Sequence, residues 1–325
     1  MVKNLFQLVR WKNLLIAGGT ILLTKYAIFQ PAINTLYPSS SPCLNFFETL
    51  LLAISVMTIA AGGYVINDIN DIKTDQINKP RKVIIGKRVS PKLAEVLYLA
   101  LTISGILLAT YIGELAGNYR LVLLHIVVAG ILWVYSKYLK NTFLIGNILV
   151  AIASSVVALT YFIFESLGYI KEYGEALKIE FETILGGPLN ILWHYSIGLT
   201  IFGFILSIIR EIIKDLQDYQ GDLIVGAGTL PIVLGKKASK IIVVLLSSIF
   251  ALSLIYTLHF KLNIAPFNKY SFLIYTWLLV IMPVPYIIYG VINAKKNEDY
   301  QRPSNTCKFI MISGILTTLI YAFNA

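Results

Sequence analysis

The sequence predicts an all-α, polytopic membrane protein: nine transmembrane helices in a helical bundle, with two acidic motifs at its cytoplasmic side. Three observations predict this fold class. Of the 325 residues, 57% are hydrophobic and only 14% are charged, whereas a soluble domain carries about 25% charged residues. The apolar residues gather in nine long runs, and Lys and Arg gather in alternate connections. This composition excludes both a plain soluble enzyme and a disordered chain.

Each of the nine runs is close to the length of about 20 residues that a helix needs to cross a bilayer. The runs are longer than the alternating segments of about 10 residues in membrane barrels, and they are apolar all round, so we expect helices. We expect the first run to be a retained helix and not a cleaved signal, because no small-residue cleavage site follows it. The runs lie at 13–30, 46–67, 94–112, 119–136, 143–163, 195–212, 238–258, 272–292 and 307–323.

The connections between the runs predict the orientation. With the N-terminus in the cytoplasm, 21 of the 27 Lys and Arg residues fall in inner connections and 6 in outer ones, and cationic loops stay in the cytoplasm. We therefore expect an integral, multi-pass protein of the inner or cell membrane, with its site facing the cytoplasm. This distribution accounts for the net charge of +10, so we expect contacts with membrane lipids and no nucleic acid partner. Lys25, near the outer end of the first run, is expected to extend toward the interface.

No linker or change of composition divides the chain, so we expect one domain over residues 1–325. Cys43 and Cys307 lie far apart, and no His or Cys cluster is present to bind a transition metal. A metal-binding or catalytic site would therefore have to be formed by residues other than His and Cys.

Two acidic segments, at the inner ends of the second and sixth runs, have the same spacing, Asp-x-x-Asp-x-x-x-Asp. They are offset by 147 residues and four runs, so both fall on the cytoplasmic side, which indicates a weak internal repeat. The aspartates are Asp68, Asp71 and Asp75 in the first segment and Asp215, Asp218 and Asp222 in the second.

If each segment stays helical, its three carboxylates share one helical face. Like charges at this spacing repel, so a cation is expected between them. Carboxylate and amide oxygens suit Mg²⁺, and two facing stripes could hold metal ions that bridge a diphosphate. The alternative is a solvated helix end that neighbouring lysines and arginines neutralise. Two clusters of identical spacing on one side favour a functional site. Asn147, within the fifth run, needs a polar partner, as a site residue or a packing residue.

The two segments resemble the paired signatures of the UbiA superfamily of intramembrane prenyltransferases. The motifs are Asn67-Asp68-x-x-Asp71-x-x-x-Asp75 and Lys214-Asp215-x-x-Asp218-x-x-x-Asp222. The resemblance covers essentially the whole chain. Its other parts are Tyr135-Ser136-x-x-Leu139-Lys140, Gly146-Asn147 and Gly226-x-Gly228-Thr229-Leu230-Pro231.

The resemblance implies an enzyme that binds a prenyl diphosphate through Mg²⁺ at both motifs, with the isoprenoid tail in a groove open to lipid. It implies that the catalytic and metal-binding residues are Asn67, Asp71, Asp75, Asp218 and Asp222. The diphosphate contacts that it implies are Arg81, Lys82, Lys140 and Lys214. The supporting residues that we expect are Asp68, Asp215, Asn147 and Tyr138.

The acceptor is less sharply indicated. The string that follows the first motif, from Gln76 to Lys82, is more similar to the glycerol-lipid branch, the geranylgeranylglycerol-phosphate geranylgeranyltransferases, than to members that act on aromatic acceptors. It departs from both because no Arg-Pro ends it. We expect a phosphorylated glycerol ether as the lipophilic acceptor, with an aromatic quinone precursor such as dihydroxynaphthoate as the alternative.

Prenyl transfer breaks an allylic carbon–oxygen bond, and aromatic faces can stabilise the resulting cation. The sequence does not distinguish among the aromatic residues that could do so, which include Tyr64, Tyr135, Tyr138, Tyr161 and Tyr219. Two other classes compete with the enzyme. A cation-coupled transporter would place its acidic residues near the midplane, not at the inner helix ends. A phospholipid-type phosphotransferase would carry one acidic site instead of two.

Overall fold

The computed structural model describes residues 2–36, 42–78, 80, 83–168, 190–261 and 269–322. Within these residues every element is a helix, and one isolated bridge joins Ile85 and Val89. The elements are, in chain order, α1 (Val2–Leu8), α2 (Trp11–Leu23), η1 (Thr24–Phe29), α3 (Gln30–Leu36), α4 (Phe46–Asn70), α5 (Ile72–Asn78), α6 (Pro91–Leu115), η2 (Tyr119–Leu121), α7 (Val122–Val134), η3 (Tyr135–Leu139), α8 (Ile145–Ser155), the helix Val157–Gly168, α10 (Asn190–Ile224), α11 (Leu230–Tyr256), η4 (Thr257–Lys261), α12 (Lys269–Thr276), η5 (Trp277–Ile281), α13 (Val284–Asn293), η6 (Asn297–Tyr300) and α14 (Gln301–Ala322).

The all-α membrane bundle is confirmed, but the count of nine spans is not. Within the described residues, seven helices are long and apolar enough to cross a membrane. An eighth span would be α8 together with the helix Val157–Gly168, which are bent by 47° relative to each other. The ninth expected run falls in α14, whose first two turns carry Arg302, Asn305 and Lys308, so that its apolar part is short.

Local sequence signals begin the helices on either side of the first acidic motif. At the start of α4, the Glu48 backbone N–H donates to the Asn45 side chain at 3.0 Å, and the Asn45 N–H donates to the Glu48 carboxylate at 2.7 Å. This reciprocal capping box satisfies two helix donors. At the start of α6, the Ser90 hydroxyl accepts from the Leu93 N–H at 3.3 Å and Pro91 occupies the first turn, where its missing donor costs nothing.

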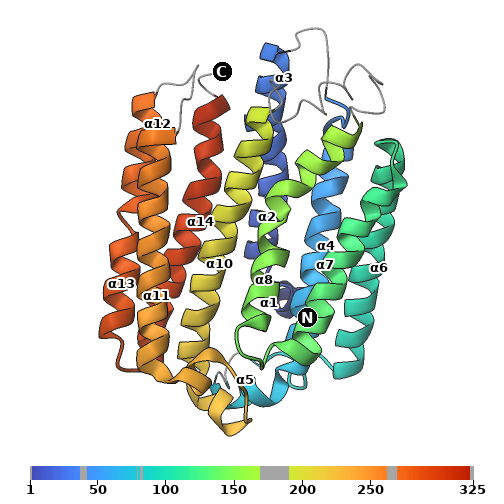
Figure 1. The fold of residues 1–325 in the computed structure, drawn as a ribbon. Coiled ribbons are helices and arrows are strands. Elements are labelled where there is room, and N and C mark those ends of the chain that lie inside the picture. Colours follow the sequence, from blue (N-terminus) through green and yellow to red (C-terminus); the bar gives the residue numbers. More distant parts are fainter. Residues whose placement is uncertain are drawn as a thin grey trace.

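The helices run side by side along one direction, and the two acidic segments lie at the same end of the bundle (Figure 1). The short helix α5 and the connection between α10 and α11 form that end, while α3 and the last turn of α14 lie at the opposite end. Around the first motif, α4 packs against α2, α6 and α7; around the second, α10 packs against α8, α11 and α14. The fold thus brings together segments that are far apart in the sequence.

Two apolar cores hold these helices. One joins the N-terminal helices through fully buried residues such as Phe29, Leu52 and Phe164. The other joins α10, α11, α13 and α14 through Ile213 and Ile287 among others. Both acidic motifs are therefore attached to well-packed helices.

A buried polar network ties helices together away from the motifs. Glu165 is completely buried, and its carboxylate accepts from the backbone N–H groups of Cys43 and Leu44, the second at 3.1 Å, and from the Tyr161 hydroxyl at 2.9 Å. The expectation that Lys25 extends toward the interface is wrong. Its ammonium is buried and donates to the Leu44 carbonyl and the Thr49 hydroxyl, because these oxygens lie within reach inside the bundle.

We expect Glu165→Ala to lower the free energy of unfolding by about 3 kcal/mol, because two buried backbone donors lose their acceptor. Unfolding of the full chain in mixed detergent micelles measures this change. Glu114→Ala is the control, since Glu114 is exposed at the end of α6, and its effect is expected to stay within about 0.5 kcal/mol. Equal stability of the two variants would contradict the role of the Glu165 network.

Candidate active site

The first acidic motif spans a break in the helix. α4 ends at Asn70, Asp71 is a turn residue, and α5 begins at Ile72. The Asn67 side-chain amide donates to the Asp71 carboxylate at 2.6 Å, and the Asp75 N–H donates to the Asp71 carbonyl at 2.8 Å. The expected continuous stripe of three aspartates is therefore interrupted at Asp71. Asp71 therefore lies at the junction of α4 and α5, where its carboxylate accepts a hydrogen bond from the Asn67 amide.

The second motif stays helical as expected, because α10 continues without interruption through Asp215, Asp218 and Asp222. The polar partner of Asn147 is a motif residue: its amide donates to the Asp215 carboxylate at 2.8 Å. The Thr229 hydroxyl, which precedes α11, donates to the Asp222 carboxylate at 3.2 Å. Two of the three aspartates are thus oriented by residues from other helices.

An asparagine that the sequence analysis did not select as a site residue docks the two motifs on each other. The Asn78 amide nitrogen, in the last turn of α5, donates to the Asp218 carbonyl at 3.1 Å. The Gly221 N–H donates to the Asn78 side-chain oxygen at 2.9 Å. A Cβ at Gly221 would collide with the Asn78 side chain, so only glycine allows this approach. α5 is therefore tied to α10 directly beside the second motif.

We expect Asn78→Ala and Gly221→Ala each to accelerate amide hydrogen exchange in α5 about tenfold. Asn78→Ala removes both hydrogen bonds that anchor this short helix, which together contribute about 1–3 kcal/mol, and the Cβ of Gly221→Ala displaces the Asn78 side chain that forms them. Hydrogen exchange followed by mass spectrometry of residues 72–78 measures the effect. Asn70→Ala is the matched control, because the Asn70 amide donates only within its own helix, to the Ile66 carbonyl at 3.0 Å. Unchanged exchange in both docking variants would show that these bonds do not hold α5.

A cation lies against the first motif, as the repulsion between aspartates predicts. The Lys140 ammonium contacts the Asp71 carboxylate and lies 3.4 Å from the Asn67 side-chain oxygen. Burial acts to lower the pKa of Lys140, but the charge of Asp71 and the hydrogen bond to it outweigh burial, and the pKa is raised. The charge of Asp75 acts in the same direction. Lys140 is therefore protonated at neutral pH and neutralises Asp71.

The other charges of the site are paired locally. Arg10 forms an ion pair with Asp68 at 2.7 Å. Lys214 lies 2.7 Å from Glu211, which also pairs with Arg210 at 3.0 Å. Glu211 is buried and was not predicted as a site residue. It lies one helical turn before Asp215, and this spacing could have indicated that it shares a face with the second motif. Lys140 and Lys214, two of the cationic residues that the resemblance implies, are thus paired with carboxylates in or beside the motifs.

The candidate tyrosines occupy different places. The charges of Asp71, Asp215 and Glu211 all act on Tyr135, which begins η3, and η3 packs against α4 and α8. Tyr138, which we expected to support the site, is exposed and its ring packs edge-on against Trp133 at 5.6 Å between centroids. The site thus favours Tyr135 as the aromatic residue that faces the aspartates.

The model of the UbiA prenyltransferase family matches residues 31–313. The chain belongs to this family. The expected enzyme class, a prenyltransferase in the membrane, is therefore confirmed, and family membership decides against the transporter and the phosphotransferase.

Relatives of this UbiA prenyltransferase share one name. The chain is 33% identical over 323 residues to the digeranylgeranylglyceryl phosphate synthase of Saccharolobus solfataricus, covering 98% of this chain and 96% of the relative. It is 28% identical over 325 residues to the digeranylgeranylglyceryl phosphate synthase of Methanococcus vannielii, covering 98% and 99% of the two chains. The similarity extends along the whole length, so both motifs fall within it.

Solved structures share the fold at lower sequence identity. A structure concerned with digeranylgeranylglyceryl phosphate synthase in membranes matches with a TM-score of 0.63 and 22% identity, covering 100% of this chain and 99% of the other. A UbiA homologue from Archaeoglobus fulgidus, bound to GPP and Mg²⁺, matches with a TM-score of 0.57 and 15% identity, covering 97% and 99%. These likenesses establish the fold of the bundle.

The residues of this UbiA prenyltransferase suit Mg²⁺ by their donor chemistry, since both motifs offer carboxylate oxygens and the first also offers the amide oxygen of Asn67. The charge of Asp71 in the first motif acts on Asp222 in the second. Among the described residues, no group of three or more His, Cys, Asp or Glu side chains is arranged to hold a metal ion. Asp71 would first have to release Lys140. The expected contacts Arg81 and Lys82 lie outside the described residues.

Proposed function

We propose that this UbiA prenyltransferase transfers a prenyl group from a prenyl diphosphate to a glyceryl phosphate lipid that already carries one prenyl ether, in an Mg²⁺-dependent reaction. The observation that carries the proposal is the docking of α5 on α10, which sets both acidic motifs at one end of the bundle. The names of the relatives support the acceptor class. The homologue bound to GPP and Mg²⁺ supports the donor and the metal.

In this proposal, Asn67, Asp71, Asp75, Asp218 and Asp222 hold the metal ions. When bound, Mg²⁺ neutralises the diphosphate and stabilises the charge that it gains as it leaves. Lys140 and Lys214, with Arg81 and Lys82, contact the diphosphate oxygens. Asp68, Asp215 and Asn147 support the site, and two of them are joined by the hydrogen bond that Asn147 donates to the Asp215 carboxylate.

The chain's residues have two tasks as the allylic carbon–oxygen bond breaks. The lysines stabilise negative charge on the departing diphosphate by fixed electrostatics. Tyr135, which lies among the aspartates, presents an aromatic face to the allylic cation. The acceptor hydroxyl then forms the new carbon–oxygen bond and releases its proton, so that the products are the ether lipid, diphosphate and a proton.

The site faces the cytoplasm in this proposal, and residues 1–325 act as one domain. The concentration of Lys and Arg at the motif end supports this orientation. Single cysteines introduced at Lys92 and at Glu114, exposed at the two ends of α6, test it in sealed cells with a membrane-impermeant thiol reagent. We expect the reagent to label only the cysteine at residue 114 from outside the cell. Labelling only at residue 92 would show the opposite orientation, with the acidic motifs outside the cell.

The direct test of function uses the purified full chain in nanodiscs with labelled geranylgeranyl diphosphate. Geranylgeranylglyceryl phosphate and dihydroxynaphthoate are offered as separate acceptors, each with Mg²⁺ and with a chelator. We expect metal-dependent product with the glyceryl phosphate. Product with dihydroxynaphthoate and none with the glyceryl phosphate would show that the acceptor is aromatic. No product with either acceptor would overturn the proposal.

A further inference from the structure

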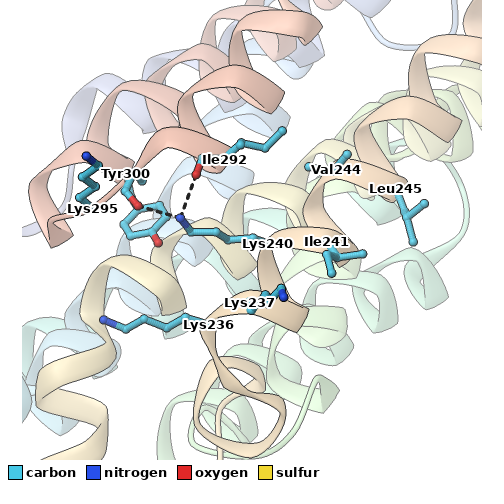
Figure 2. Close-up of a pocket in the computed structure, with 10 residues that line it drawn as sticks. Lys236, Lys237, Lys240, Ile241, Val244, Leu245, Ile292, Lys295 and Tyr300 are labelled. Carbon is cyan, nitrogen blue, oxygen red and sulfur yellow. Dashed lines mark hydrogen bonds between the residues drawn. The ribbon is translucent and has the colours of Figure 1, made fainter.

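A groove with four lysines lies on the face that α11 shares with α13, and none of its lining residues belongs to the acidic motifs. Its volume is about 590 Å³. Figure 2 shows Lys240 and Lys295 beside Tyr300, Lys236 and Lys237 farther from it on α11, and the aliphatic side chains following α11 away from the lysines. The lining residues are Lys236, Lys237, Lys240, Ile241, Val244, Leu245, Ile292, Ala294, Lys295 and Tyr300.

Two of the four lysines are fixed by the protein and two are available. Lys240 reaches across to α13, where it donates to the carbonyls of Ile292 at 3.1 Å and Ala294 at 2.7 Å (Figure 2). The Lys236 ammonium lies 4.1 Å from the centre of the Tyr219 ring. Among the described residues, the ammonium groups of Lys237 and Lys295 have no hydrogen-bond or ion-pair partner.

The nearby carboxylate does not cancel this charge. Asp299 accepts from the backbone N–H groups of Lys295 at 2.9 Å and Lys296 at 2.8 Å, and its charge also acts on Lys240. Its carboxylate is thus engaged by the backbone, while four ammonium groups line the groove. Four ammonium groups and one nearby carboxylate leave the groove with a net positive charge.

The apolar side of the groove continues along the membrane-spanning part of α11. Ile241, Leu245, Ile249 and Leu252 lie three or four residues apart on one helical face, and they are 51%, 55%, 59% and 65% exposed. They belong to the span Leu230–Phe260, so this exposed face meets hydrocarbon. Lys236, Lys237 and Lys240 lie in the first turns of the same span, and Lys295 follows the end of α13, where hydrocarbon gives way to the polar interface.

We propose that this groove binds a phosphate-bearing anionic membrane lipid. Lys237 and Lys295, which lie on either side of Lys240 in Figure 2, attract the phosphate by their charge, and one hydrocarbon chain lies along Ile241 and Leu245. Basic pockets between transmembrane helices recognise anionic lipid headgroups through this combination of charge and apolar surface. The proposal goes beyond the proposed function and does not depend on it.

The test uses the full chain with Lys237→Gln and Lys295→Gln combined. Lys3→Gln combined with Lys92→Gln is the matched control, because all four lysines are exposed and both variants lose two positive charges. Binding of phosphatidylglycerol and of phosphatidylcholine is titrated by native mass spectrometry in detergent. Each lysine near an anionic lipid contributes about a fivefold factor in affinity, so the pair is expected to weaken phosphatidylglycerol binding about 30-fold.

We expect the wild type and the control to bind phosphatidylglycerol equally and to prefer it over phosphatidylcholine. Equal binding of the two lipids, or equal affinity of the groove variant and the control, would overturn the proposal. Displacement of phosphatidylglycerol by inorganic phosphate at the same concentration would show a site for free anions and overturn it as well. If the double variant does not fold, Lys237→Glu alone, at an exposed position, gives the same comparison against Lys92→Glu.

Discussion

Replacing Asp71 with asparagine is expected to lower the rate of prenyl transfer about 100- to 1,000-fold, the range seen when one preorganised electrostatic group is lost. Asp71 is only 8% exposed, accepts from Asn67, and acts on Asp222 across the site. Asparagine keeps the shape of the side chain and removes its charge. The effect therefore reports on the charge that a metal ion and its diphosphate require. The rate with labelled prenyl diphosphate at saturating Mg²⁺ measures it.

The control for this substitution is Glu95→Gln, which makes the same chemical change at an exposed position of α6 near the same end of the bundle. We expect the control to keep its activity. Asp222→Asn is expected to match Asp71→Asn, whereas Asp68→Asn is expected to cost less because Asp68 pairs with Arg10. A rate for Asp71→Asn within threefold of the control would show that Asp71 does not bind the metal ion.

Hydrophobic patterning predicts the helices of this protein well because each span is a local property of about 20 residues. The runs in the first half of the chain coincide with α2, α4, α6 and α7. Patterning did not predict the 47° bend after Ser155 or the break at Asp71. Both depend on how neighbouring helices pack, and this is absent from a hydropathy profile.

The spacing of the aspartates predicted a candidate site, but not the hydrogen bonds that join its two motifs. Spacing along a helix fixes which side chains share a face, so the two motifs were found. The bonds from Asn78 to Asp218 and Gly221 join residues about 140 positions apart, and no local rule predicts such a pair. The same holds for Lys25, whose buried partners are Leu44, just before α4, and Thr49, within α4.

Lys140 links the stability of the protein to its proposed chemistry. In the structure it neutralises Asp71, and in the proposed reaction it contacts the diphosphate, so it has to leave Asp71 when a metal ion binds. We expect Lys140→Gln to lower the free energy of unfolding without metal by about 1–3 kcal/mol, because it leaves a mostly buried carboxylate without its cation. The same substitution is expected to lower the transfer rate about 100-fold.

Added Mg²⁺ separates these two effects. Because Mg²⁺ no longer competes with an ammonium for Asp71, it is expected to stabilise Lys140→Gln more than the wild type, while the transfer rate stays low. Mixed-micelle unfolding with and without Mg²⁺ measures the first effect, and the transfer assay measures the second. Lys137→Gln is the matched control, since Lys137 is exposed and its ammonium lies over the Trp133 ring at 5.1 Å.

The pH dependence tests the assignment of charge to Lys140. Burial lowers its pKa, but Asp71 outweighs burial and the pKa is raised above its ordinary value of 10.5. A raised lysine pKa contributes stability that is complete below the unfolded value and is lost as the pH rises through the folded one. The stability difference between the wild type and Lys140→Gln is therefore expected to stay constant from about pH 6 to 9. A difference that shrinks within that range would mean that Lys140 loses its proton there, and that another cation neutralises Asp71.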